Sequence, residues 1–116
     1  MRAYLPITAK ELESFLSNGD FAPAEIFAVT EVFIAENPGL DLEECEYLRS
    51  LEAAALALQS GDVGFVLAVE ISEGATPKKS DIECLFQVRS GEADEIELTW
   101  FGPTEISHHL SQWLAQ

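Results

Sequence analysis

Three consecutive segments in the second half of the chain follow a period of two, in which every second residue shares one face, and they constrain the fold more than any other feature. They are VGFVLAVEI from residue 63, IECLFQVR from residue 82 and EIELTWF from residue 95. Such a period is typical of strands. Because only the short loops SEGATPKKSD and SGEAD join them, the three segments predict an antiparallel meander.

The first half of the chain mixes helical and strand signals. Thr8 and Glu11 have the spacing of a capping box, and Gly19 is a natural stop, which predicts a helix over 9–18. RAYLPIT before it predicts a strand whose proline favours an edge or a strand end. EIFAVT, residues 25–30, predicts a second strand, and EVFIAE predicts a short helix capped by Thr30.

The segment DLEECEYLRSLEAAALALQS, residues 41–60, opens with four carboxylates and then becomes almost wholly apolar. Asp41 and Glu44 have capping-box spacing, so the acidic opening is interpreted as a helix start rather than a cation site. Apolar residues then recur every three or four positions and predict one inward stripe. The stripe comprises Leu42, Cys45, Leu48, Leu51, Ala55 and Leu58.

The last segment begins with Gly102 and Pro103, a pair typical of a helix start. It predicts a final helix with Ile106, Leu110, Trp113 and Leu114 turned inward. Together the signals predict a single α+β domain over residues 1–116, in the order βα-βα-βββα. We expect a mixed five-stranded sheet with a parallel, right-handed first βαβ step, a C-terminal antiparallel meander and helices mainly on one face.

The charge of the chain is unusual. Twenty-one Asp and Glu residues face six Lys and Arg residues, which gives a formal net charge of -15. Such a chain repels nucleic acids and anionic membrane surfaces and attracts cations and basic proteins. The charge has two interpretations: it attracts a basic partner, or it serves only to keep the protein soluble. The longest apolar runs, FVLAV and AAALAL, are far too short for a membrane span, and the start lacks a signal peptide. We therefore expect a cytoplasmic protein that binds neither membranes nor nucleic acid directly.

Three blocks of the first half, MRAYLPIT, FAVT at 27–30 and LEECEYLRSLEAAALA, carry a family resemblance. In this order they resemble an uncharacterised family of small actinobacterial proteins that open Met-Arg-Val-Tyr-Leu-Pro-Ala-Thr. The second half, ending TWFGPTEISHHLSQWLAQ, resembles the family less. The resemblance implies a bacterial cytoplasmic protein with a domain of unknown function, and it supplies no activity and no site residues.

The residues that most often carry chemistry form no recognisable motif. Cys45 and Cys84 are far apart and are expected in the core, as small apolar side chains. His108 and His109 are adjacent, so they point in different directions on a helix and do not form a metal pair. The acidic run EADEIE lacks the spacing of an EF-hand loop. The sequence predicts no catalytic residue, no metal site and no cofactor.

The first strand of the predicted meander is apolar on both faces. If the helices cover one face, the other remains as an exposed apolar patch with an acidic rim, which is typical of a protein-binding surface; if a helix covers it, it is core. The predicted partner-binding residues are Val66, Leu85, Phe101, Glu70, Glu83 and Glu97.

These observations favour an acidic, non-catalytic interaction module that binds a protein partner or forms a homodimer. One alternative is a nucleic-acid mimic whose carboxylates imitate phosphates and inhibit a basic protein. The other is a small enzyme that uses His109 with a carboxylate in a cleft between the last helix and the sheet.

Overall fold

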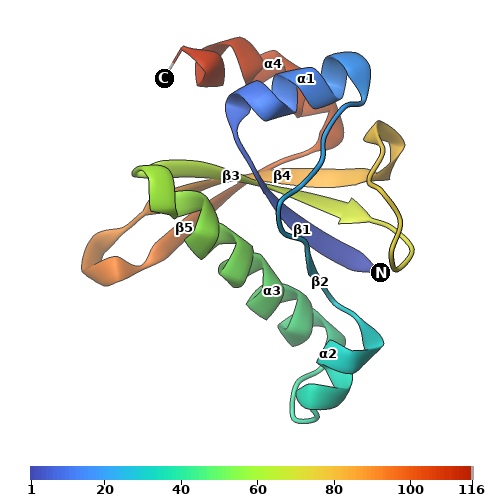
Figure 1. Ribbon diagram of the computed structural model, residues 1–116. Helices are drawn as coiled ribbons and strands as arrows, with labels where there is room; N and C mark the ends of the chain where they lie inside the picture. Colours follow the sequence, from blue (N-terminus) through green and yellow to red (C-terminus); the bar gives the residue numbers. More distant parts are fainter. Residues whose placement is uncertain (116) are drawn as a thin grey trace.

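The computed structural model describes residues 1–115, apart from the side chains of Ser60 and Asp94. Its helices and strands follow one another in the predicted order (Figure 1). They are β1 (Arg2–Ile7), α1 (Ala9–Asn18), β2 (Phe27–Ala28), α2 (Glu31–Glu36), α3 (Leu42–Ala57), β3 (Val63–Glu70), β4 (Ile82–Ser90), β5 (Ile96–Phe101) and α4 (Pro103–Leu114).

The five strands form one antiparallel sheet of order β2-β1-β3-β4-β5. The predicted meander of β3, β4 and β5 is confirmed, whereas the prediction of a mixed sheet is wrong. A parallel step would need α1 to return the chain along β1. In Figure 1, α1 lies over one face of the sheet, and the segment after the helix runs back to the start of β1, where β2 pairs antiparallel with β1.

Helices cover both faces of the sheet, which corrects the expectation that they lie mainly on one. Helices α1 and α4 lie on one face, and α3 lies on the other, over β1 and β3 (Figure 1). The sheet therefore separates two apolar cores.

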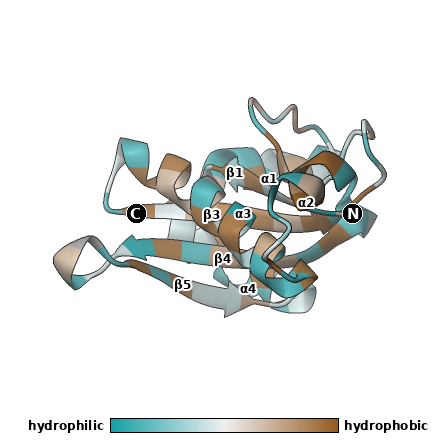
Figure 2. Cartoon of the chain, turned by 90° about the horizontal axis from the view of Figure 1, so that it is seen from below, coloured by the Kyte–Doolittle hydropathy of each residue, from teal (hydrophilic) through white to brown (hydrophobic). Residues whose placement is uncertain are grey.

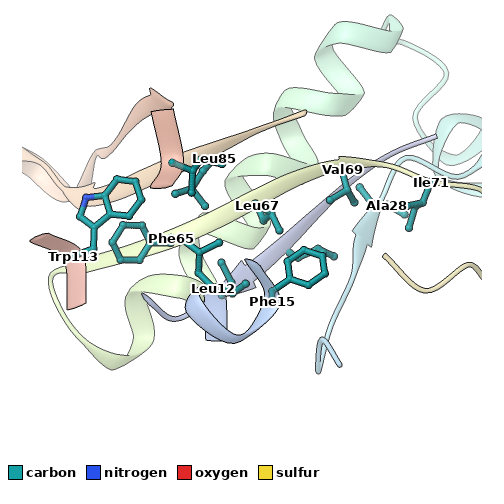
Figure 3. Close-up of a cluster of buried hydrophobic side chains, with 13 residues drawn as sticks. Leu12, Phe15, Ala28, Phe65, Leu67, Val69, Ile71, Leu85 and Trp113 are labelled. Carbon is teal, nitrogen blue, oxygen red and sulfur yellow. The ribbon is translucent and has the colours of Figure 1, made fainter. Parts of the chain in front are cut away.

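The core between the sheet and helices α1 and α4 is built from large side chains (Figure 3). Leu12 and Phe15 of α1 are fully buried, and Phe15 also meets Phe21, with ring centroids 5.7 Å apart. Trp113 of α4 packs on Phe65 at a centroid distance of 5.0 Å. These contacts confirm the predicted inner face of α4 and place Leu12 and Phe15 on the inner face of α1.

Helix α3 contributes small side chains to the core beneath it, and the predicted inward stripe is only partly correct. Cys45 is buried, Leu58 packs against this core and Leu51 is partly buried. Leu42, Leu48 and Ala55 are exposed instead. The helix faces the sheet with Ser50, Ala53, Ala54 and Ala57.

The close approach of α3 to the sheet explains this orientation. A Cβ atom built on Gly64 of β3 would lie 2.6 Å from the carbonyl oxygen of Ala57. Larger side chains on the inner face of α3 would hold it away from the sheet, so its leucines lie at the sides and on the outside.

The predicted helix starts are confirmed. Asp41 accepts a hydrogen bond from the Glu44 backbone N–H at 2.8 Å, and the Asp41 N–H donates to the Glu44 carboxylate at 3.2 Å. Thr8 and Glu11 form the same reciprocal pair at the start of α1. The acidic opening of α3 is therefore a capping box.

Candidate functional site

The predicted partner-binding face is not formed, because its apolar members lie on opposite faces of the sheet. Val66 of β3 belongs to the core under α3, and it lies in register with Phe86 of β4. Leu85 lies in register with Leu67 and Phe101, on the side of α1 and α4. Val66 and Leu85 are buried and Phe101 is partly buried, so the three do not make one exposed patch.

The predicted acidic rim is divided in the same way. Glu70 is placed at the α3 side of the sheet, where it meets the N-terminal ammonium at 3.2 Å and lies 3.8 Å from the Arg2 Nε atom. Glu83 and Glu97 are exposed. By the alternation of β5, Glu97 shares the face of Phe101, whereas Glu83 lies at the register shift between β3 and β4.

Two neighbouring clefts at the end of the sheet where β1 begins are a better candidate site. One, the acidic cleft, has a volume of about 370 Å³ and lies between α2, α3 and the ends of β1 and β3. Its lining residues include the carboxylates of Glu31, Glu46, Glu70 and Glu73. The apolar side chains of Ile34 and Leu42 also line it, and that of Leu42 is 57% exposed.

The second, the apolar cleft, has a volume of about 500 Å³ and lies between the loop before β2 and the loop after β3. It shares Met1, Thr30 and Glu73 with the acidic cleft, so the two are continuous. Most of its lining is apolar and comes from Phe21, Ala22, Pro23, Ile26, Ala28, Ile71, Ala75 and Pro77.

The chain terminus fixes the boundary between the two clefts. The Met1 ammonium donates a hydrogen bond to the Ile71 carbonyl at 2.7 Å and pairs with Glu70. The Ile71 N–H in turn donates to the Met1 carbonyl at 3.0 Å. These contacts hold the loop after β3 against the start of β1, so both clefts have a firm common wall.

The one arginine of α3 is directed away from solvent. Arg49 donates from Nε to the Ala28 carbonyl at 2.9 Å and from an Nη atom to Glu52 at 3.2 Å. Its guanidinium also lies 4.1 Å from the ring centroid of Phe33, a cation–π contact. Arg49 therefore ties α3 to β2 and α2 and offers no positive charge at the acidic cleft.

Next to the acidic cleft, β1 and β4 bury two ionisable groups. Burial raises the pKa of Tyr4 to about 12; the Glu46 and Glu70 carboxylates add to the rise, and Arg2 opposes it. Burial also raises the pKa of the Cys84 thiol, against the opposing effects of Arg2 and Trp100. Both groups are neutral near pH 7, and a Cys84 with a raised pKa is a poor nucleophile.

The two histidines of α4 point in different directions, as predicted, and His108 is exposed. His109 is partly buried, stacks on Trp113 at a centroid distance of 5.6 Å and makes a tilted contact with Phe101 at 4.9 Å. A cleft of about 520 Å³ between Thr8, Asp62, Arg89 and Trp113 lies at this side of the molecule, but His109 does not line it. The arrangement expected for an enzyme based on His109 is therefore not assembled at this cleft.

Within residues 1–115 the structure holds no cluster of three or more His, Cys, Asp or Glu side chains arranged for a metal ion. None of the helices described is both long and apolar enough to span a membrane.

Sequence reasoning missed both clefts, because each joins segments more than forty residues apart. The signals available were the apolar residues around Glu31 and Glu46; the helical period predicted two of them, Leu42 and Leu48, to face the core. Five of the seven large apolar side chains that are exposed among the described residues belong to α2 and the first half of α3. They are Val32, Ile34, Leu42, Tyr47 and Leu48.

Comparisons with known proteins bear on the part of the chain that builds both clefts. No curated protein and no solved structure matches the chain. A family match covers residues 1–90, which includes β1 to β4, the three blocks of the sequence resemblance and every residue that lines the two clefts. The chain therefore belongs to the family of unknown function DUF6912.

Proposed function

We propose that the protein is a non-catalytic interaction module that binds a basic protein partner in the acidic and apolar clefts around Met1. The observation that carries this proposal is one continuous depression that combines exposed apolar side chains with three carboxylates, Glu31, Glu46 and Glu73, outside the salt bridges of the described residues. Apolar contact supplies most of the binding free energy in such interfaces, while charge complementarity selects the partner and speeds association.

The carboxylates of the acidic cleft are available to a partner. Within residues 1–115, the salt bridges of the structure do not involve Glu31, Glu46 or Glu73. Glu70 already holds the Met1 ammonium and Arg2. The three free carboxylates therefore complement Lys or Arg side chains of a partner.

The apolar cleft supplies the second half of the recognition. Ile26 is 41% exposed and lies beside Phe21 and Pro23 at the cleft wall. An apolar side chain of the partner that enters here would remove these surfaces from water. The matching ligand is thus a segment with an apolar anchor next to one or more cationic residues.

Two triple variants of equal net charge test the proposal. The cleft variant is Glu31→Gln, Glu46→Gln and Glu73→Gln; the control variant is Glu13→Gln, Glu92→Gln and Glu95→Gln, all at exposed positions outside both clefts. Each removes three negative charges from the formal net charge of -15. Equal melting temperatures would show that both fold.

Proteins captured from a lysate of the source organism are compared by quantitative mass spectrometry, and each specific one is purified and titrated. We expect the cleft variant to bind at least about tenfold more weakly and the control variant to bind within about twofold of the wild type. An Ile26→Ser variant should also weaken binding, because it removes part of the apolar cleft.

Equal weakening by both triple variants would contradict the proposal and favour the nucleic-acid mimic, in which the total charge matters more than its position. Conversely, a catalytic activity that is lost in His109→Gln with the fold intact would favour the enzyme.

A further inference from the structure

Strand β5 forms an open edge of the sheet. It is the last strand in the order β2-β1-β3-β4-β5, and among residues 1–115 only β4 pairs with it. An open edge presents a row of backbone N–H and C=O groups that can pair with another strand.

The directions of the β5 backbone groups follow from two hydrogen bonds near the hairpin. The Gly91 N–H donates to the Glu95 carbonyl at 2.6 Å, and the Ser90 N–H turns the other way and donates to the Asp62 carbonyl at 3.3 Å. Hydrogen-bonded and non-hydrogen-bonded pairs alternate along an antiparallel ladder. The β5 residues opposite Ser90, Val88 and Phe86 therefore point their N–H and C=O groups outward, and they are Ile96, Leu98 and Trp100.

The same three residues carry the apolar side chains of this edge. Ile96 and Leu98 are partly buried against the core under α3, and Trp100 is 56% exposed. In Figure 2, which views the molecule from the α3 side, β4 and β5 lie beside α3 and are not covered by it. From Ile96 to Phe101 the strand contains neither Pro nor Lys, two residues that commonly protect an edge from pairing.

We propose that two copies of the chain pair through β5 in an antiparallel manner, about a two-fold axis at Leu98. In this register Leu98 faces Leu98 of the second copy, and Ile96 faces Trp100 of the second copy. All the outward N–H and C=O groups of Ile96, Leu98 and Trp100 then find partners. The exposed Trp100 ring is covered, and two five-stranded sheets become one continuous sheet.

The charges of β5 select this register over its neighbours. A shift of one residue would set outward-pointing groups against inward-pointing ones. The next allowed register in one direction places Glu97 opposite Glu97 of the second copy, which is repulsive. The next allowed register in the other direction places Ile96 opposite Gly102, so the Ile96 side chain has no apolar partner. In the proposed register Glu97 faces Thr99, with no like charges opposed.

The helices leave room for this pairing. Helix α4 packs on β4 and α1, and α3 lies mainly over β1 and β3, so neither closes the outer side of β5. The self-association is independent of the proposed partner binding, since β5 contributes no residue to the acidic or the apolar cleft. The two interactions also respond differently to salt. Added salt weakens the binding of a basic partner, because it screens the attraction, and strengthens the pairing of two copies that each carry a charge of -15, because it screens their repulsion.

The experiment changes Thr99, which is exposed and would lie opposite Glu97 of the second copy. Non-hydrogen-bonded pairs bring side chains closest, so Thr99→Glu creates two repulsive pairs per dimer and Thr99→Lys creates two attractive ones. The dissociation constant is measured by sedimentation with the full chain at several salt concentrations. Ser14→Glu and Ser14→Lys on α1 make the same charge changes away from β5.

We expect a concentration-dependent wild-type dimer, about tenfold weaker in Thr99→Glu and about tenfold tighter in Thr99→Lys, with the Ser14 variants within about twofold of the wild type. The double variant Glu97→Lys with Thr99→Glu should restore dimerisation. A wild-type chain that stays monomeric up to about 500 µM would overturn the proposal and leave the β5 edge to a strand of another protein. A dimer that responds equally to Thr99 and Ser14 changes would also overturn it.

Discussion

The two faces of the sheet are closed in opposite ways. On the face of α1 and α4, large side chains such as Phe15 and Trp113 fill a deep layer (Figure 3). On the other face, α3 turns small side chains, Ser50, Ala53, Ala54 and Ala57, to the sheet, and at Gly64 it lies so close that a Cβ atom would not fit. The first face is sensitive to lost volume and the second to added volume, because protein interiors tolerate neither voids nor overlaps.

The largest expected effect is on the face of large side chains. Phe15→Ala removes a fully buried ring and should lower the free energy of unfolding by about 3–5 kcal/mol, through lost apolar burial and the void left behind. Urea denaturation measures the change. Leu16→Ala, at a partly buried neighbour on the same helix, should cost clearly less. Equal costs would show that the depth of this core does not control stability.

On the opposite face, the addition of a single methyl group should be harmful. In Gly64→Ala the new Cβ would meet the backbone of Ala57, so α3 must shift, and we expect a loss of about 1–3 kcal/mol. Gly39→Ala is the control, since a Cβ at Gly39 has no atom within 4 Å. If both variants are equally stable, α3 does not pack as closely as described.

The two faces should also differ in alkaline solution, because Tyr4 and Cys84 are buried on the α3 side. The folded-state pKa of Tyr4, about 12, is above the unfolded value of 10.0, so its contribution to stability is complete below pH 10 and is lost as the pH rises towards 12. We expect a loss on the order of 1 kcal/mol by about pH 11, with an earlier onset from Cys84. Denaturation curves of Tyr4→Phe should show a smaller loss of stability over the same rise in pH.

The smallest effect concerns the start of α3, outside both cores. Asp41→Ala removes the capping acceptor of the Glu44 N–H and should cost about 1 kcal/mol. Calcium at millimolar concentration should leave the melting temperature of the wild type nearly unchanged, because the carboxylates serve the helix end. A rise of several degrees with calcium that disappears in Asp41→Ala would show a cation site instead.

Local signals in the sequence predicted much of the fold. The capping boxes at Thr8 and Asp41 fixed the starts of α1 and α3, because a cap depends on residues only three positions apart. The meander followed from its period of two and its short loops. The inner faces of α1 and α4 were also predictable, since each of these helices has one apolar side.

The candidate site was far less predictable. Its clefts form where the start of β1, the loop before β2, α2, α3 and the end of β3 meet. No local sequence pattern predicts that these distant segments come together. Leu42 was expected in the core because its period matched that of Cys45, yet it lies beyond the sheet and lines the acidic cleft.

By itself, the sequence determined the order of the elements, the helix starts and the strongly negative charge, because these depend on neighbouring residues or on composition alone. Only the tertiary structure decided the direction of β2, the side from which α3 covers the sheet and the separation of Val66 from Leu85 onto opposite faces. The pairing of strands sets the last of these, since a one-residue change in register turns every side chain of a strand to the other face. The orientation of α3 depends on the close contact between Ala57 and Gly64, two residues that pack only when helix and sheet meet.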